Sequence, residues 1–276
     1  MEDKLIPVTS VASGFGIEFS PNAYMYTNQV VNLFFVGTDG GWVLIDAGMP
    51  KSAEKIRAEA EERFGKGSKP EAIILTHGHF DHVGGIEELV EWWDVPVYAH
   101  ELELPFLQGK IDYPEPDSSV EGGMVAKMSP IFPNEAINLG SHVQNLPKDG
   151  SVPFMPGWKW IHTPGHTPGH ISLFHEQDRI LIAGDAFVAV KQEYLYKVIT
   201  QELEISGPPR YFTTDWQAAW DSVRKLSALK PRIAATGHGG VMSEELLTSS
   251  LDLLVSEFET IAIPDYGRFV DEGTYH

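Results

Sequence analysis

The chain contains no cysteine among its 276 residues. This absence excludes disulfide bonds, thiolate-ligated zinc and a cysteine nucleophile. Basic residues are scarce as well, because 20 Lys and Arg stand against 39 Asp and Glu and give a formal net charge of −19. Proteins that bind nucleic acids draw their affinity from basic surfaces. A nucleic acid is therefore not expected as a substrate or partner.

Long apolar runs are also missing, since no stretch approaches the ~20 apolar residues of a membrane span. Residues 1–7 carry acids where a signal peptide needs basic residues. The lack of cysteine is compatible with a reducing compartment. We therefore expect a cytoplasmic protein that works on a small-molecule substrate without membrane contact. The assembly that we consider beside a monomer is a homodimer.

The sequence does contain a dense group of metal-binding side chains. The apolar run at 72–75 predicts a short buried strand, and the amphipathic stretch at 86–93 predicts a helix. Three imidazoles and a carboxylate lie between them, within six consecutive positions: His77, His79, Asp81 and His82. A strand that ends on a polar cluster before a helix is typical of sites in α/β proteins.

Three further motifs follow along the chain: His-Thr-Pro-Gly-His-Thr-Pro-Gly-His at 162–170, Ala-Gly-Asp-Ala at 183–186 and Thr-Gly-His-Gly-Gly at 236–240. Together with His-x-His-x-Asp-His at 77–82, and in this order, they resemble the metallo-β-lactamase superfamily of binuclear hydrolases. The resemblance covers roughly residues 30 to 240. It implies a four-layer αββα sandwich.

The resemblance also implies the roles of seven side chains. The first metal would be held by His77, His79 and His166, the second by Asp81, His82 and His238, and Asp185 would bridge the two. Imidazoles and carboxylates without thiolate suit Zn²⁺, with Mn²⁺ or Fe²⁺ as alternatives. A hydroxide bridging two such ions would attack the carbonyl of a small ester, lactone or thioester. Asp81 would orient this nucleophile and move its proton.

Three more residues are candidates for support or substrate contact. Asp46 could accept a hydrogen bond from a ligand imidazole, although an Asp before Ala-Gly is also an ordinary turn residue. His170 could support the site or touch the substrate. Related lactonases place a Tyr three residues after the bridging Asp; here that position is Val188, and Tyr194 is the candidate replacement.

The chain reads as two similar halves within one domain, 1–276. Each half runs hairpin, Asp, helix, Lys-Pro, strand and His. In both halves the His comes eight residues after the Lys, at 69 to 77 and at 230 to 238. Residues 1–29 are expected to be an irregular lead-in with strand character, and the stretch at 243–261 is expected to form one amphipathic helix. The stretch at about 101–156 has little periodicity and is interpreted as a substrate-loop insertion.

Several hydrolase types remain as interpretations. A glyoxalase II-type thioesterase is one, but only one basic side chain besides His276, that of Arg268, follows His238 to meet glutathione. Classical zinc β-lactamases usually carry Cys in place of Asp185. Outside hydrolysis, the alternatives are a di-iron redox protein, whose relatives usually carry Glu at the position of His79, and a non-catalytic metal-binding module.

Overall fold

The computed structural model describes residues 9–270. Residues 1–8, which include the acids that argue against a signal peptide, and residues 271–276 lie outside the described part. Two β-sheets form the centre of the molecule. The seven-stranded sheet follows chain order: β1 (Gly16–Ser20), β2 (Ala23–Asn28), β3 (Val31–Thr38), β4 (Gly41–Ile45), β5 (Ala72–Ile74), β6 (Val97–Ala99) and β7 (Val143–Asn145). The five-stranded sheet has the order β12 (Met242–Ser243), β11 (Ile233–Ala235), β10 (Ile180–Ile182), β9 (Ile171–His175) and β8 (Trp158–His162).

Helices lie on the outer side of each sheet and on the connections between strands. The first part of the chain contributes α1 (Ala53–Phe64), α2 (Phe80–Val83), α3 (Ile86–Trp93), α4 (Leu104–Leu107), α5 (Met124–Met128) and the 3-10 turn η1 (Ser129–Ile131). The second part contributes α6 (Leu195–Thr200), α7 (Trp216–Ala228), α8 (Glu244–Ser256) and α9 (Phe258–Ile261). None of the helices in residues 9–270 combines the length and apolar character needed to cross a bilayer.

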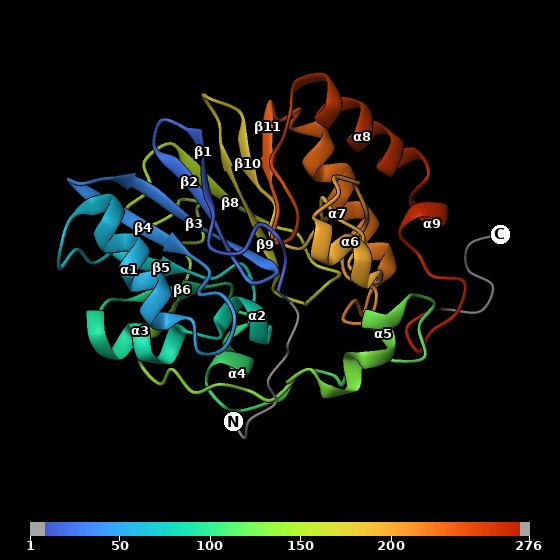
Figure 1. Ribbon diagram of the computed structural model, residues 1–276, viewed down its shortest axis with the longest axis horizontal. Helices are drawn as coiled ribbons and strands as arrows, with labels where there is room; N and C mark the ends of the chain where they lie inside the picture. Colours follow the sequence, from blue (N-terminus) through green and yellow to red (C-terminus); the bar gives the residue numbers. More distant parts are fainter. Residues whose placement is uncertain (1–8, 271–276) are drawn as a thin grey trace.

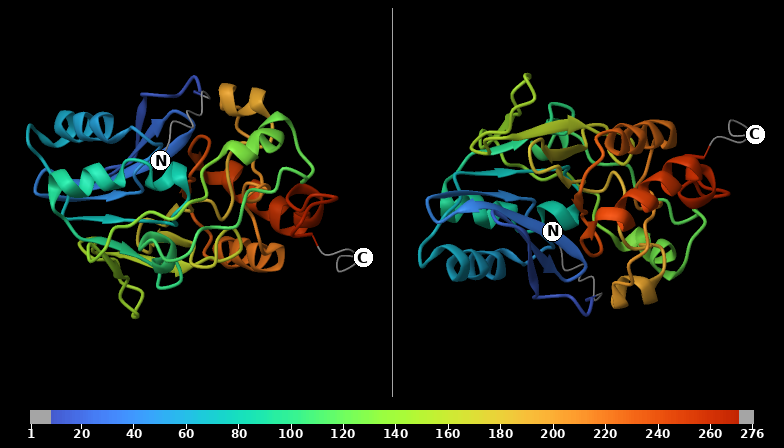
Figure 2. Two further views of the ribbon diagram at one scale, coloured as in Figure 1. Left: turned by 90° about the horizontal axis from the view of Figure 1, so that it is seen from below. Right: turned by 90° about the horizontal axis from the view of Figure 1, so that it is seen from above.

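The elements are stacked as helix, sheet, sheet and helix, which confirms the αββα sandwich. In Figure 1, α1 and α3 lie on one side of the two sheets, and α7 and α8 lie on the other. The same two blocks are visible from below and from above in Figure 2. The ends of the central strands in each sheet are therefore free to carry a site along a shared edge.

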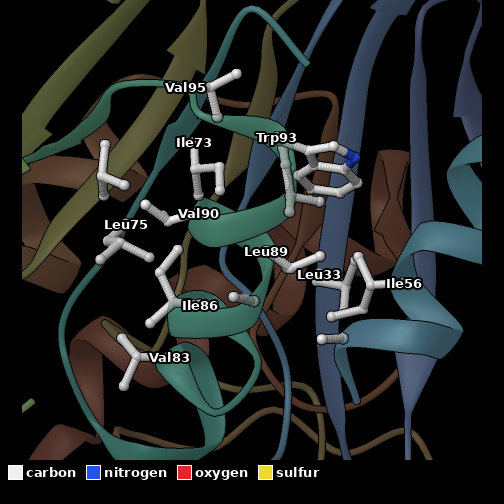
Figure 3. Packing of buried hydrophobic residues seen from close by; sticks show 14 of the residues in the cluster. Leu33, Ile56, Ile73, Leu75, Val83, Ile86, Leu89, Val90, Trp93 and Val95 are labelled. Carbon is white, nitrogen blue, oxygen red and sulfur yellow. The ribbon is translucent and has the colours of Figure 1, made fainter. Parts of the chain in front are cut away.

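Alternating side chains along each strand fill two different cores, because successive residues of a strand point to opposite faces. In β3, Leu33 and Phe35 pack outward against α1 and α3, while Phe34 packs inward against the second sheet. Figure 3 shows the outer core, where Ile86 and Trp93 of α3 lie over the first sheet. Both faces of β3 are buried over most of its length, so its sequence is mainly apolar.

The two predicted halves have the same path. The pair β3–β4 is an antiparallel hairpin, α1 follows, and β5 then pairs parallel with β4. In the second half, β9–β10 is the hairpin, α7 follows, and β11 pairs parallel with β10. The parallel pairing requires a crossover of this kind. The predicted lead-in is more regular than expected, because β1 and β2 extend the first sheet.

Two other expectations are changed by the structure. The C-terminal helix predicted over 243–261 is two helices, since Glu257 has a non-helical φ of −116° and ψ of 27°. The turn there lets Phe258 bury its ring against Trp220, with centroids 5.6 Å apart. The segment 101–156 is not only a loop, because it contains α4, α5 and the edge strand β7 of the first sheet. Figure 1 shows it running along the lower edge of the molecule from α4 to α5.

Candidate metal centre

The free ends of β5, β10 and β11 bring the predicted ligands to one place. His77 follows β5 by three residues and His238 follows β11 by three residues. Asp81 and His82 lie in α2, and His79 directly precedes it. The loop between β8 and β9 carries His166, and the turn after β10 carries Asp185. All seven residues are at most 9% exposed: His77, His79, Asp81, His82, His166, Asp185 and His238. Residues that are far apart in sequence thus share one buried edge.

Their ligand atoms cluster in the arrangement that the resemblance implies. Atoms within 4.8 Å of one another come from a first group, which is His77, His79 and His166, and from a second group, which is Asp81, His82 and His238. Asp185 lies between the groups. Its Oδ2 is 3.6 Å from Nε2 of His166 and 3.3 Å from Nε2 of His238, and its Oδ1 is 3.6 Å from Nε2 of His82. One carboxylate therefore faces both groups.

Hydrogen bonds fix which nitrogen each imidazole of the second group presents. Nδ1 of His82 lies 2.9 Å from Oδ2 of Asp46, and Nδ1 of His238 lies 2.8 Å from the carbonyl oxygen of Val30. A carboxylate or carbonyl oxygen can only accept, so both Nδ1 atoms carry the hydrogen. Nε2 of each ring then points to the centre. Partners of this kind orient metal-binding histidines.

The first group is oriented in the same way by two threonine hydroxyls. Nδ1 of His77 is 3.0 Å from Oγ1 of Thr76, and Nδ1 of His166 is 3.2 Å from Oγ1 of Thr213. Each hydroxyl gives its own hydrogen to a carboxylate or carbonyl oxygen, so it accepts from the imidazole. Nε2 of both rings is left for a cation. His79 instead directs Nδ1 inward, 2.9 Å from Nε2 of His166.

These residues fit a pair of divalent cations. Within residues 9–270, the buried atoms without a hydrogen-bond partner include Nε2 of His77, Nε2 of His82 and Oδ1 of Asp185. Buried polar atoms are normally paired, so three unpaired atoms of metal-binding types at one point fit a bound cation. The backbone also closes tightly on this point, since a Cβ at Gly237 would lie 2.0 Å from Oδ1 of Asp185.

The electrostatics of the metal-free cluster separate the two groups. Burial lowers the pKa of every imidazole in the first group, to about 3 for His79. Burial acts in the same direction on His238, but the carboxylates of Asp185 and Asp81 outweigh it and raise its pKa to about 10. The pKa of His82 is likewise raised well above its usual value, mainly by Asp185. Without metal, the imidazoles of the first group are therefore neutral and can bind a cation directly. The imidazoles of the second group are protonated and must release these protons when a cation binds.

Asp46 and His170 stand behind the ligands. Oδ1 of Asp46 accepts from the backbone N–H of Thr76 at 2.8 Å, and its Oδ2 accepts from the hydroxyl of the same residue at 2.8 Å. Nε2 of His170 accepts from the backbone N–H of Asp185 at 2.9 Å, so it has no lone pair for a metal or substrate. Both residues are fully buried. They hold the turns that carry the ligands.

Tyr194 is placed differently. It precedes α6, its side chain is 46% exposed, and in residues 9–270 no hydrogen bond or ring contact joins it to the seven ligands. The aromatic side chains that do lie beside the cluster are Tyr113 and Phe212, whose rings are 4.7 Å and 4.4 Å from that of His79. The aromatic stretch at 194–214 follows Asp185 in the chain and is a sequence candidate for the opposite wall of a pocket, and Phe212 belongs to it. No local sequence pattern singles out Tyr113.

Another residue beside the site that the sequence did not reveal is Glu103. It lies in a Glu-Leu-Glu run that resembles an ordinary charged surface segment. Its side chain is nevertheless fully buried and hydrogen-bonded to both loops that carry the first group. Burial raises its pKa, while its hydrogen-bond donors act in the opposite direction.

Residues 26–238 match the family model described as the metallo-beta-lactamase superfamily. The "Probable metallo-hydrolase YflN" of Bacillus subtilis (strain 168) is 50% identical over 264 residues, which are 95% of this chain and all of that protein.

Among solved structures, TTHA1623 "in a di-iron-bound form" is 28% identical with a TM-score of 0.55, covering 86% of this chain and 98% of that one. BJP-1, a subclass B3 metallo-beta-lactamase of Bradyrhizobium japonicum, is 20% identical with a TM-score of 0.62, covering 90% of this chain and 94% of that one. The second likeness concerns the fold alone. The family match spans most of the chain and includes all seven clustered side chains, so this protein belongs to the metallo-beta-lactamase superfamily.

Proposed function

We propose that this protein is a metal-dependent hydrolase of small esters, lactones or thioesters, in which water attacks the carbonyl carbon and the acyl C–O or C–S bond breaks. The observation that carries the proposal is the convergence of two ligand groups on Asp185, with imidazole nitrogens and a carboxylate oxygen left unpaired. The name of the Bacillus relative, a probable metallo-hydrolase, supports the reaction class. A site for two cations beside one bridging carboxylate suits hydrolysis.

The surroundings of the first group favour an uncharged, partly apolar substrate. The ring of Phe212 stacks on His79 at 4.4 Å, and Phe80 and Phe132 pack beside it. These rings continue into the buried apolar cluster under α5 and α6. Apolar walls with a few polar groups are typical of small-molecule sites. The net charge of −19 adds a general repulsion of anions.

Two divalent ions, when bound, supply Lewis acidity and lower the pKa of a coordinated water to near 7. The chain's own residues then orient and move protons. Oδ2 of Asp81 lies 3.4 Å from Nε2 of His238. Asp81 is 9% exposed, more than Asp185 or Asp46, so its carboxylate is the one that substrate and water can reach. Asp81 therefore accepts the proton of the attacking water and passes it to the leaving group. Asp46 keeps His82 in the tautomer that leaves Nε2 bare.

We infer that the resident metal is Zn²⁺, because imidazole and carboxylate donors suit this ion and it has no geometric preference of its own. Fe²⁺ and Mn²⁺ are the competing choices, and iron is favoured by the description of TTHA1623 as di-iron-bound. Metal analysis of protein purified without added metal decides among them. The partner that we propose is a small-molecule substrate in the cytoplasm.

A substrate panel on matched variants tests the hydrolase. It contains acyl-homoserine lactones of increasing acyl length, aryl esters and lactoylglutathione, measured with wild type, Asp185→Asn and the exposed control Asp178→Asn. We expect kcat/KM to fall roughly a thousandfold in Asp185→Asn only, because metal assistance contributes several kcal/mol. Turnover of lactoylglutathione alone would favour the glyoxalase II-type alternative. Full turnover in Asp185→Asn would refute the proposed role of the cluster.

A further inference from the structure

Glu103 is a buried acid whose position the reaction does not explain. It precedes α4, and its side chain has no exposed surface. Glutamate is rarely buried in full unless it is paired, yet no Lys or Arg forms an ion pair with it among residues 9–270. Neither of its oxygens lies in a ligand group. Its carboxylate must therefore be satisfied by neutral donors.

Four such donors surround the carboxylate. Oε1 accepts from the hydroxyl of Thr167 at 2.7 Å and from the backbone N–H of Gly169 at 2.8 Å. Oε2 accepts from the backbone N–H of Gly78 at 3.1 Å and from the hydroxyl of Tyr113. A carboxylate offers about four lone-pair sites, so the hydrogen-bonding capacity of Glu103 is filled.

Three of these donors come from the two loops that carry the first metal group. Gly78 lies between His77 and His79, while Thr167 and Gly169 come one and three residues after His166. Glu103 thus ties together two loops, about 90 residues apart in sequence, that carry all three imidazoles of the first group. Within residues 9–270, no single side chain behind the ligands bonds to the backbone of both loops that carry the second group. Its imidazoles are held separately, by Asp46 and by the carbonyl of Val30, and Asn32 bonds only the loop around His238.

The two loops are also shaped to close on this side chain. A Cβ at Gly169 would lie 2.8 Å from Cγ of Glu103, and a Cβ at Gly78 would lie 2.5 Å from the hydroxyl oxygen of Tyr113. Any larger residue at either position would push the loop away from the carboxylate. Hydrogen bonding and close packing therefore act on the same two loops.

We propose that Glu103 is a positioning residue for the first metal group, holding His77, His79 and His166 at the separation that one cation requires. The first part of the 101–156 segment is then a support behind the ligands rather than a substrate loop. The inference rests on the metal site and not on the choice of substrate. It is tested by metal affinity, which substrate assays do not enter.

Cobalt titration monitored by visible absorption, in two single-group backgrounds, isolates the effect. His238→Ala weakens the second group and leaves the first to be measured, whereas His166→Ala does the reverse. In the His238→Ala background, we expect Glu103→Ala to weaken Co²⁺ binding roughly 10- to 100-fold, as loss of ligand-supporting partners does. In the His166→Ala background, the same change should leave the affinity within about twofold. Glu101→Ala, an exposed acid two residues away, is the matched control.

Conservative variants separate positioning from general destabilisation. Glu103→Gln keeps one acceptor oxygen for the Thr167 loop but presents an N–H to Gly78, so its affinity should lie between those of wild type and Glu103→Ala. Tyr113→Phe and Thr167→Val each remove one donor and should weaken the first group a few-fold. Equal weakening of both groups by Glu103→Ala overturns the proposal, as does unchanged affinity in a folded variant. If Glu103→Ala fails to fold, wild-type affinity in both Tyr113→Phe and Thr167→Val overturns it.

Discussion

The two halves of the molecule follow the same path but contribute to the centre differently. Each contains a hairpin, a crossover helix and a parallel strand, and the register shows which positions correspond. Ile45 pairs with Ile74 in the first half, and Ile182 pairs with Ala235 in the second. Counting from these pairs, His77 and His238 are each three residues past the strand (77 − 74 and 238 − 235). The two histidines are therefore structural equivalents.

The two aspartates are not equivalent, which corrects the symmetry that the sequence suggested. Asp46 is one residue past Ile45, whereas Asp185 is three past Ile182. The counterpart of Asp46 is Ala183, since the backbone N–H of each bonds to the last residue of the neighbouring strand, at 2.9 and 2.8 Å. The longer reach takes Asp185 to the centre, and the shorter one leaves Asp46 behind the ligands. A shift of two residues thus separates a bridging carboxylate from a supporting one.

The largest expected effect comes from removing each aspartate's charge. Asp185→Asn removes the carboxylate that faces both groups and should reduce kcat/KM roughly a thousandfold. Asp46→Asn retains one oxygen for Thr76 but turns an amide N–H toward the Nδ1 hydrogen of His82. That clash should weaken metal binding about 10- to 100-fold, but two metal ions per chain should still be detectable. The substrate panel measures kcat/KM for both variants, and metal titration with elemental analysis measures their metal binding. Equal losses in the two variants would contradict the register comparison.

The residues before the equivalent histidines sharpen the contrast further. Thr76 and Gly237 occupy corresponding positions, but a Cβ at Gly237 would lie 2.0 Å from Oδ1 of Asp185. We expect Gly237→Ala to displace Asp185 and cost at least tenfold in metal affinity. Thr76→Val, which only removes the hydroxyl that orients His77, should cost less. The reverse order of the two losses would show that the close backbone approach is unimportant.

The pH dependence distinguishes the two groups. The raised pKa of His238, about 10 in the metal-free protein, means that its protonated form adds stability below pH 6.5. That stability is lost as the pH rises toward 10. Metal binding needs the deprotonated ring, so metal affinity should rise over the same window. Urea unfolding of chelator-treated protein and calorimetric metal titration at pH 6.5, 8 and 9.5 measure the two trends; parallel trends would contradict the assignment of the proton.

Much of the fold and the core of the candidate site could be predicted from sequence. A strand that is buried on both faces, such as β3, appears in the sequence as a mainly apolar run. The shared Lys-Pro spacing predicted that His77 and His238 follow equivalent strands, as they do. Ligands at strand ends are local signals, because a few consecutive residues carry both the strand and the cluster. The break at Glu257 was missed, since the apolar periodicity continues across it while the backbone turns.

The supporting residues could not be predicted, because their roles depend on contacts between distant segments. Glu103 meets Gly78, Thr167 and Gly169 only after both sheets have formed. Its neighbour Glu101 has the same side chain and is exposed, so residue type carries no signal here. The stacking of Phe212 on His79 likewise joins two distant segments, the connection between α6 and α7 and the start of α2.

The smallest expected effect concerns the crossover helices, which begin differently in the two halves. Asp215 caps α7 by accepting from the backbone N–H of Ala218 at 2.9 Å, whereas Ser52 makes no side-chain cap bond to α1. Asp215→Ala should lower the free energy of unfolding by about 1 kcal/mol, and Asp215→Asn, which keeps an acceptor, by less. Urea denaturation measures both. Because Asp215 lies outside the ligand groups, metal affinity should stay unchanged; a loss there would mean that α7 helps to set the position of His166.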